Sequence, residues 1–532
     1  MMRSIVLSGF MGSGKSTVGP IVAARLGAAF VDTDAEIERA AGRPIAELWA
    51  REGEATFRAR EAAIVERVLA DGAAKVVAFG GGTVMAPRLR RLAIDRALVV
   101  TLTAAPETIV ARVGDPRNRP NLAIGVDPLA RASDLLAFRA EAYSECHMSI
   151  ATDALSPALL ADAVVKLAAR DPLLVPLGAR SYAIDVCLDE PARLAEAIAR
   201  LAPSSVVLVT DANVQAMRGQ AVNAALAGLA APVISIVLAP GEANKTLAGV
   251  ASIWDAALRA KVDRDTVVVA AGGGVVGDLA GFAAACLLRG VRFIQVPTTV
   301  LAMVDSSVGG KTGFDHPAGK NLVGAFHQPN VVVADLAHLE TLSAGQRLAG
   351  LAEVVKIALA TDEAFLGRIE AQAAALSRGD VAALTPVVRD AIMAKIRVVR
   401  DDEREHGARA LLNLGHTVGH ALEAYGGYGR WLHGEAVALG TVIELQATAA
   451  LGFTEPAAVD RCIELFASLG LPTAIDSAEL AAAWPFVESD KKRGGGALRL
   501  PVVTSAGCAH VERVQLTRLR DAVLTGQAVG RS

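Results

Sequence analysis

The segment GFMGSGKS at residues 9–16 comes directly after an apolar run at 4–7 and directly before a stretch with helical character. It has the full spacing of a phosphate loop, in which glycines let backbone N–H groups surround a phosphate. Lys15 would neutralise the outer phosphates of a nucleotide, and Ser16 would ligate Mg²⁺. A chance glycine-rich turn is the alternative, but the strand–loop–helix context argues against it. The segment therefore predicts an α/β nucleotide-binding domain with a parallel sheet.

Short β-rich runs alternate with charged, helical segments on both sides of residue 170. Up to about 340 this alternation predicts βαβ units, and hence two successive α/β domains with parallel sheets. Beyond 345 helical periods dominate until a β-rich run at 498–503, so we expect an all-helical third domain. The predicted domains are 1–172, 173–342 and 343–532.

Composition excludes several classes of protein. About half of the 532 residues are apolar, and the net charge of −3 without a basic run argues against nucleic-acid binding. The five cysteines contain no CxxC pair, which argues for a reducing cytoplasm and against disulfides or a cysteine-based zinc site. The most membrane-like stretch, 267–288, holds four glycines before Asp278, so a strand, a turn and a buried helix are expected there. The apolar N-terminal run passes into the phosphate loop by Gly9, which argues against a signal peptide.

Acidic and basic residues after the phosphate loop narrow the range of reactions that the domain could catalyse. Asp32 could steady the Mg²⁺ shell, and Asp34 could orient an attacking hydroxyl or accept its proton, although such aspartates also cap helices. Arg58, Arg119 and Arg139 follow, together with a triple glycine at 80–82. Guanidinium groups would grip the carboxylate of a small acid and cover the transferring phosphoryl group. A kinase for a small hydroxy acid is therefore expected.

Together, the phosphate loop, Asp-Thr-Asp at 32–34, GEATFRARE at 53–61, the triple glycine and the 139–143 segment resemble shikimate kinase across residues 1–168. The resemblance implies catalytic roles for Lys15, Asp34 and Arg119. Implied shikimate contacts are Asp34, Arg58, Gly81 and Arg139; implied ATP contacts are Gly12, Ser13, Gly14, Lys15, Ser16, Thr17 and Arg119; implied magnesium ligands are Ser16 and Asp32. The lid motif departs from the family's Arg-Pro-Leu-Leu, reading RPNL at 119–122, and Arg117 lies nearby. Which arginine closes over ATP therefore stays open.

Two glycine-rich motifs in the second half are ambiguous by themselves. GGGVVG at 272–277 follows a strand and fits GxGxxG, but the 292–299 segment lacks the usual ribose-binding acid. An ordinary Rossmann dehydrogenase is thus not expected, although a dinucleotide phosphate at this turn is. GKT at 310–312 imitates the end of a phosphate loop, but Asp305 stands where the first glycine belongs. A second phosphate loop is rejected.

Histidines and unpaired lysines mark a second site. His416 and His420 lie one helical turn apart and Glu423 follows, so spacing alone nominates these three as a metal face, with packing within a helix as the alternative. His433 comes later in the chain. Several basic residues have no acidic partner in sequence, and neighbouring glycines and apolar runs favour an anion pocket over a solvated surface. They are Lys311, Lys320, Lys356, Lys395, Arg409, Lys491 and Lys492.

These segments resemble 3-dehydroquinate synthase from about 175 to 520, through ordered motifs at 272–281, 289–290, 297–299, 305–312, 319–322, 352–356, 412–435 and 490–492. The resemblance implies that the zinc ligands are Glu353, His416 and His433, in place of the set that spacing alone nominated. It also implies that His420 contacts the substrate. Catalytic roles are implied for Lys311, Lys356 and His420. Implied NAD contacts are Asp211, Asn213, Glu242, Lys245, Gly273, Gly274, Asp278, Thr298, Thr299 and Lys320. Implied substrate contacts are Arg289, Asp305, Lys311, Asn321, Lys356, Lys395, Arg409, Asn413, His420 and one of the lysines at 491–492, with Lys491 preferred. Gln346 departs from the family, where an acidic NAD contact is common.

The two resemblances together imply a cytoplasmic, bifunctional enzyme of aromatic biosynthesis. Its expected cofactors are ATP–Mg²⁺, NAD and Zn²⁺, with Co²⁺ as the alternative metal, and its expected partners are small molecules rather than nucleic acid or membranes. A homodimer through the synthase region is expected. Two rivals stay open: a different kinase joined to a metal-dependent alcohol dehydrogenase, and a regulatory fusion with one dead site.

Overall fold

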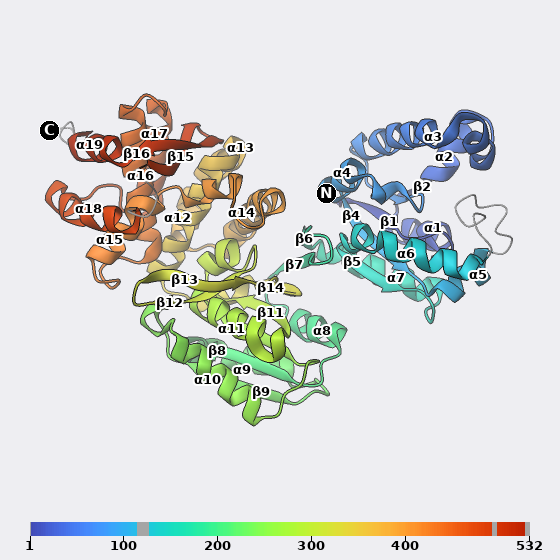
Figure 1. Cartoon of the computed structure of the whole chain (residues 1–532), viewed down its shortest axis with the longest axis horizontal. Coiled ribbons are helices and arrows are strands. Elements are labelled where there is room, and N and C mark those ends of the chain that lie inside the picture. Colours follow the sequence, from blue (N-terminus) through green and yellow to red (C-terminus); the bar gives the residue numbers. More distant parts are fainter. Residues whose placement is uncertain (1, 114–126, 492–496, 527–532) are drawn as a thin grey trace. The chain divides into compact units, whose positions relative to one another are not determined.

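The computed structural model describes residues 2–113, 127–491 and 497–526 (Figure 1). The chain divides into two compact units, Met1–Ala183 and Ile184–Ser532. The division falls inside strand β7 (Tyr182–Cys187), and the domain ends given above remain predictions. Across the described ranges, every helix is too short or too polar to traverse a lipid bilayer.

The first unit contains a five-stranded parallel sheet in the order β2-β3-β1-β4-β5. The middle of central strand β1, residues 5–7, is apolar and buried on both faces, as expected for a parallel sheet covered by helices. Ile5 packs with Val18 of α1 and Leu160 of α7, whereas Val6 faces the opposite cluster with Val65 of α3. The elements are β1 (Ser4–Ser8), α1 (Lys15–Leu26), β2 (Ala29–Asp32), α2 (Thr33–Ala41), α3 (Ile45–Ala70), β3 (Lys75–Ala78), α4 (Pro87–Arg96), β4 (Ala97–Thr103), α5 (Pro106–Val113), α6 (Pro128–Ser144), β5 (Met148–Ala151) and α7 (Pro157–Arg170).

A second sheet has seven strands in the order β6-β7-β14-β11-β10-β8-β9. Strand β10 lies at its centre with all six residues buried, and its pairings with β8 and β11 are parallel. The α/β pattern predicted from the sequence is therefore confirmed in both sheets. Its elements are β6 (Leu173–Val175), β7, α8 (Ala192–Leu201), β8 (Val206–Asp211), α9 (Ala212–Leu226), β9 (Val233–Leu238), α10 (Leu247–Arg259), β10 (Val267–Gly272), α11 (Gly274–Cys286), β11 (Arg292–Pro297) and β14 (Val331–Asp335).

The C-terminal region is helical, as predicted, and α12 runs through its interior with every residue from Ala349 to Ala360 buried. Two antiparallel hairpins complete the second unit: β12–β13, which packs against α11 and was not anticipated from the sequence, and β15–β16, whose first strand contains the predicted run at 498–503. The elements are β12 (Lys311–His316), β13 (Gly319–Phe326), α12 (Ala344–Thr361), α13 (Glu363–Arg378), α14 (Val381–Asp401), α15 (His416–Tyr425), α16 (His433–Ala450), α17 (Pro456–Leu469), α18 (Ser477–Lys491), β15 (Ala497–Ser505), β16 (Cys508–Gln515) and α19 (Leu516–Gly526).

Candidate active sites

The predicted phosphate loop connects β1 to α1 at the carboxyl edge of the first sheet. Gly9 has φ +131°, and a Cβ there would lie 2.2 Å from the carbonyl oxygen of Leu102, so only glycine fits. The Lys15 ammonium donates to the carbonyls of Gly9 and Phe10, each at 2.8 Å. The Ser16 hydroxyl donates to Asp32 Oδ2 at 2.7 Å. A cation and a hydroxyl–carboxylate pair therefore meet at one loop, as nucleotide–Mg²⁺ binding requires.

Arg58 is held beside this loop by a buried carboxylate. Its Nη1 donates to Glu61 Oε2 at 2.7 Å, and Glu61 is only 1% exposed. The other oxygen of Glu61 accepts a hydrogen bond from Thr83 Oγ1 at 2.6 Å. Glu54, a second acidic neighbour at 3.3 Å, is mostly exposed. The buried Glu61 carboxylate thus holds the Arg58 guanidinium group in position. The sequence showed only that Glu61 lies one helical turn after Arg58.

The triple glycine and α6 complete the same cavity, which measures about 480 Å³. Arg139 Nη1 and the Tyr143 hydroxyl both donate to the carbonyl of Gly81, at 2.8 and 2.5 Å. Asp34, Arg58, Gly81, Arg139 and the loop residues 12–17 all line this cavity, so the predicted residues converge there. Arg112 also lines it, donating to Thr152 Oγ1 at 2.8 Å, and the sequence analysis missed it. Arg117 and Arg119 lie outside the described residues.

Three different helices, α12, α15 and α16, bring Glu353, His416 and His433 together. Their ligand atoms lie within 4.8 Å of one another. Glu353 Oε1 is 3.7 Å from His416 Nε2 and 3.5 Å from His433 Nε2, and its side chain is fully buried. Glu353 Oε2 forms an ion pair with the Lys356 ammonium, whereas Oε1 faces the two imidazoles. A buried carboxylate oxygen that faces two imidazoles fits a tetrahedral zinc ion.

The electrostatics of this cluster also suit a cation. Although burial raises the pKa of Glu353, the Lys356 ammonium and the two imidazoles outweigh it and hold that pKa well below its usual range. Burial, with help from Lys356, lowers the pKa of His416 to about 3, so its imidazole is neutral near pH 7. His433 loses some basicity to burial, but hydrogen bonds to Glu353 and Glu423 raise its pKa to about 10. Glu353 is thus ionised and His416 neutral, as metal ligands must be, and a metal would displace the proton that His433 carries.

A second group, His420, Glu423 and His433, overlaps the first through His433. His433 Nδ1 lies 3.2 Å from Glu423 Oε2, and the Lys320 ammonium lies 3.3 Å from Glu423 Oε1. Burial raises the pKa of Glu423, but the hydrogen bond to His433 and the charges of His433, Lys320 and His420 together outweigh it and bring the pKa to about 2. Neither group is the set that helical spacing alone nominated, because both include His433, which starts a different helix.

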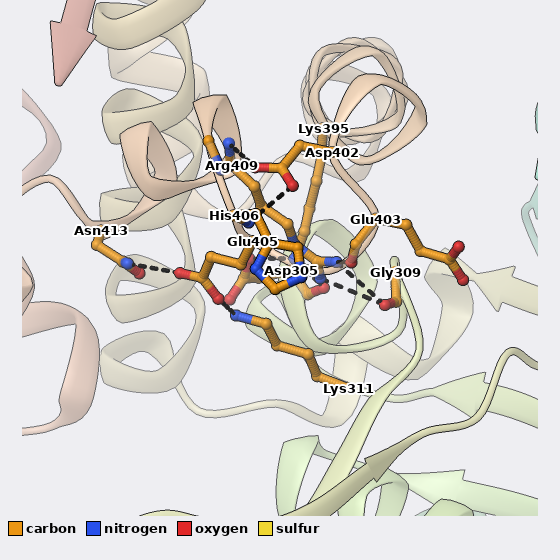
Figure 2. Close-up of polar contacts among 11 residues, drawn as sticks. Asp305, Gly309, Lys311, Lys395, Asp402, Glu403, Glu405, His406, Arg409 and Asn413 are labelled. Carbon is orange, nitrogen blue, oxygen red and sulfur yellow. Dashed lines mark hydrogen bonds and ion pairs between the residues drawn. The ribbon is translucent and has the colours of Figure 1, made fainter.

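An anion pocket of about 560 Å³ lies next to the cluster. Arg409 donates to the Gly309 carbonyl at 3.3 Å, and Lys395 forms an ion pair with Asp305 (Figure 2). The predicted residues lining this pocket are Asp305, Lys311, Asn321, Lys356, Lys395, Arg409, Asn413 and His420. Arg289 is not among the lining residues; it ends a short helix, Leu287–Arg289, with φ +69°. The side chain of Lys491 lies outside what the structure describes.

Glu405 also lines the anion pocket and was missed by the sequence analysis. It pairs with Lys311 and accepts a hydrogen bond from Asn413 Nδ2 at 2.7 Å (Figure 2). Its backbone has φ +60°, an uncommon conformation for a non-glycine residue. A charged segment such as DDEREHG at 401–407 carries no sequence signal for this placement.

A third cavity, of about 520 Å³, opens at the carboxyl edge of the second sheet. Helix α11 begins here at Gly274, and such an N-terminus is suited to a pyrophosphate. Lys245 is 2.7 Å from Asp278 Oδ2 and donates to Asn321 Oδ1 at 2.6 Å. All ten predicted NAD contacts line this cavity: Asp211, Asn213, Glu242, Lys245, Gly273, Gly274, Asp278, Thr298, Thr299 and Lys320.

This cavity adjoins the anion pocket, because Asp278, Asp305, His420 and His433 line both. A dinucleotide, a metal and an anionic substrate would therefore meet at one place. That arrangement suits the oxidation of a substrate hydroxyl held next to a metal.

Comparison with known families gives three matches along the chain. The models described as 3-dehydroquinate synthase N-terminal and 3-dehydroquinate synthase C-terminal match residues 235–349 and 350–493. The shikimate kinase model matches residues 11–169. The matches fall on the two α/β parts and the helical part that contain the sites described above.

Individual proteins also match this chain over the part that the synthase models cover. The 3-dehydroquinate synthase of Azotobacter vinelandii is 48% identical over 356 residues, which cover 66% of this chain and 93% of that protein. The 3-dehydroquinate synthase of Pseudomonas fluorescens SBW25 is 49% identical over 345 residues, covering 64% and 92%. A solved structure of ValA, the 2-epi-5-epi-valiolone synthase of Streptomyces hygroscopicus with NAD⁺ and Zn²⁺ bound, is 28% identical with a TM-score of 0.59, covering 65% and 97%.

Proposed function

Because the chain belongs to the 3-dehydroquinate synthase family and contains a shikimate kinase domain, we infer that its two sites perform two reactions of the shikimate pathway. The kinase, a phosphotransferase, converts shikimate to shikimate 3-phosphate with ATP. The synthase, a phosphorus–oxygen lyase, converts 3-deoxy-D-arabino-heptulosonate 7-phosphate to 3-dehydroquinate and phosphate.

In the kinase site, Arg58 and Arg139 hold the carboxylate of shikimate, and Asp34 orients the hydroxyl that attacks ATP. Lys15, now bonded to two loop carbonyls, turns to the phosphates and stabilises the charge that develops during transfer. Ser16 and Asp32 would hold the magnesium ion that accompanies ATP. We also assign Arg119 to the cover over the phosphates.

In the synthase site, Glu353, His416 and His433 would hold zinc, and the ten residues of the third cavity would hold NAD⁺. When bound, zinc supplies Lewis-acid polarisation of a ring hydroxyl, and NAD⁺ supplies reversible hydride acceptance. Lys311, Lys356, Lys395 and Arg409 hold the carboxylate and the departing phosphate through their positive charges. His420 lies where it can move a proton between substrate and solvent, because it is exposed yet lines both pockets.

One observation carries the synthase assignment: the same side chains, His420 and His433 among them, line the anion pocket and the dinucleotide cavity beside a zinc-type cluster. A polyol dehydrogenase would need the dinucleotide and the metal but not the buried lysines and arginine of the anion pocket. Those cations are what a phosphorylated acid requires.

Release of phosphate from 3-deoxy-D-arabino-heptulosonate 7-phosphate by the full-length chain tests this function. With catalytic NAD⁺, we expect phosphate release that a strong chelator abolishes, without accumulation of NADH. Net NADH formation from a polyol would instead identify an alcohol dehydrogenase. No release from folded, zinc-restored protein would contradict the synthase assignment and favour a fusion with one dead site.

We further propose a cytoplasmic homodimer formed through the synthase region. The five cysteines are free thiols, which suits a reducing compartment. Light scattering on the purified chain should give twice the 54.8 kDa chain mass, and the monomer mass would contradict the proposal.

A further inference from the structure

We propose that Glu423 is a positioning residue that couples the metal cluster to the dinucleotide cavity, so that metal binding tightens NAD⁺ binding. The inference rests on the proposed function, since it takes the Glu353 cluster as the metal site and the third cavity as the NAD⁺ site.

One oxygen of Glu423 engages a residue of the metal cluster. Glu423 is 5% exposed on α15, and its Oε2 lies 3.2 Å from His433 Nδ1. The other ring nitrogen of His433, Nε2, faces Glu353 Oε1 at 3.5 Å. The imidazole therefore directs one nitrogen to the cluster and donates from the other to Glu423, and such a carboxylate fixes both the tautomer and the ring orientation of a metal-binding histidine.

The second oxygen of Glu423 reaches the dinucleotide cavity. Its Oε1 accepts a hydrogen bond from the Lys320 ammonium at 3.3 Å. Lys320 lines that cavity from β13, lies 3.5 Å from Glu242 Oε1, and stands 4.4 Å above the ring of Tyr428. A single buried carboxylate thus connects a metal-side imidazole to a cation available for the dinucleotide.

A second metal ion at His420, Glu423 and His433 is the competing explanation of this cluster. It is disfavoured because the Lys320 ammonium already lies 3.3 Å from Glu423 and would repel a cation bound there. Both Glu423 oxygens also already face donors. The carboxylate is therefore an acceptor between two donors rather than a ligand.

The consequence is a linkage between the two sites. A metal bound at His433 Nε2 holds the ring, the ring holds the Glu423 carboxylate, and the carboxylate holds the Lys320 ammonium in place. The side chains that line the cavity then lose less conformational entropy when NAD⁺ binds, so the affinity for NAD⁺ rises. By reciprocity, NAD⁺ raises the affinity for the metal by the same factor.

Titration calorimetry on the full-length protein tests the linkage. The dissociation constant of NAD⁺ is measured with the metal removed by a chelator and again at saturating zinc. We expect zinc to lower it by at least about fivefold in the natural chain. In Glu423→Gln, which keeps the shape of the side chain, zinc affinity measured against a chelating dye should fall by about 10- to 100-fold. At saturating zinc, NAD⁺ affinity in this variant should equal that of the metal-free form.

Two further variants keep the test decisive. Lys320→Met breaks the other contact of Glu423; it should bind zinc as the natural chain does but lose the zinc effect on NAD⁺. Glu464→Gln removes an exposed charge on α17 and should keep the full effect. Retention of the zinc effect in Lys320→Met or in folded Glu423→Gln would overturn the inference.

Failure of the premise is distinguishable from failure of the inference. If the natural chain binds neither zinc nor NAD⁺, the proposed function falls and the inference with it. If it binds both, with equal NAD⁺ affinity whether or not zinc is present, the inference alone is overturned.

Discussion

The ammonium group of Lys395 is buried against the carboxylate of Asp305, at the wall of the anion pocket (Figure 2). The two residues come from α14 and from the turn at 302–306, so only folding brings them together. Burial lowers the pKa of Lys395 to about 8, despite the opposing effect of Asp305. The main charge on this side of the pocket therefore titrates within the range of an ordinary enzyme assay.

This pKa predicts a pH limit on substrate binding. Below about pH 8 Lys395 carries its charge; as the pH rises through 8 the ammonium loses its proton, and attraction for the anionic substrate is lost. The KM for the heptulosonate 7-phosphate should rise above pH 8, by up to about tenfold per pH unit. In Lys395→Arg the guanidinium stays charged, so the rise near pH 8 should disappear. An unchanged KM–pH profile in that variant would assign the limit to another group.

Replacing Glu353 by Gln should abolish the synthase without affecting the kinase. Zinc affinity, measured with a chelating dye, should fall by more than about 100-fold, because even outer-shell partners of metal ligands contribute about 10- to 100-fold. The Lys356 ammonium, 1% exposed, would lose the carboxylate with which it forms an ion pair, and the free energy of unfolding of the metal-free protein should fall by about 3–5 kcal/mol. A variant with full zinc affinity would contradict the proposed ligand set.

Lys15→Met gives the opposite pattern. The ammonium that binds the loop carbonyls is removed, so the kinase kcat should fall by at least about 100-fold. Phosphate release by the synthase should be unchanged, because the two sites lie in separate compact units. Coupled assays of both reactions on one preparation provide the measurement. Residual kinase activity near the natural level would show that Lys15 does not act on the phosphates.

The Glu61–Arg58 contact predicts a selective effect on shikimate binding. In Glu61→Gln the buried partner of Arg58 loses its charge, and a charge-assisted hydrogen bond contributes about 1.5–3 kcal/mol. The KM for shikimate should therefore rise by about 10- to 100-fold, while the KM for ATP changes little.

Glu54→Gln is the matched control, since Glu54 contacts the same arginine at 3.3 Å from an exposed position. Exposed pairs contribute little, so its KM should change by no more than a few-fold. Equal effects of the two variants would show that burial of Glu61 does not position Arg58.

Local patterns predicted the architecture because each depends on residues close in sequence. The phosphate loop lies between β1 and α1 as expected, and the alternation predicted up to about residue 340 contains strands β8 and β14. The hairpin β12–β13 was missed because glycines and charged residues interrupt any apolar alternation over 311–326. Its strands are held by hydrogen bonds to each other and by the packing of Phe314 of β12 into the core beside α11.

The sequence by itself determined the phosphate loop, the alternation of strands and helices, and the pair His416 and His420, since loop spacing and helical periodicity are properties of contiguous residues. Helical spacing did not show which carboxylate joins which imidazole; the family resemblance implied Glu353, His416 and His433, and the tertiary structure brings these three side chains together. Glu353 meets His416 and His433 because α16 packs against both α12 and α15, and Glu423 is left to bridge His433 and Lys320. Contacts between such distant segments follow from the burial of apolar helix faces, which helical spacing within one segment does not record.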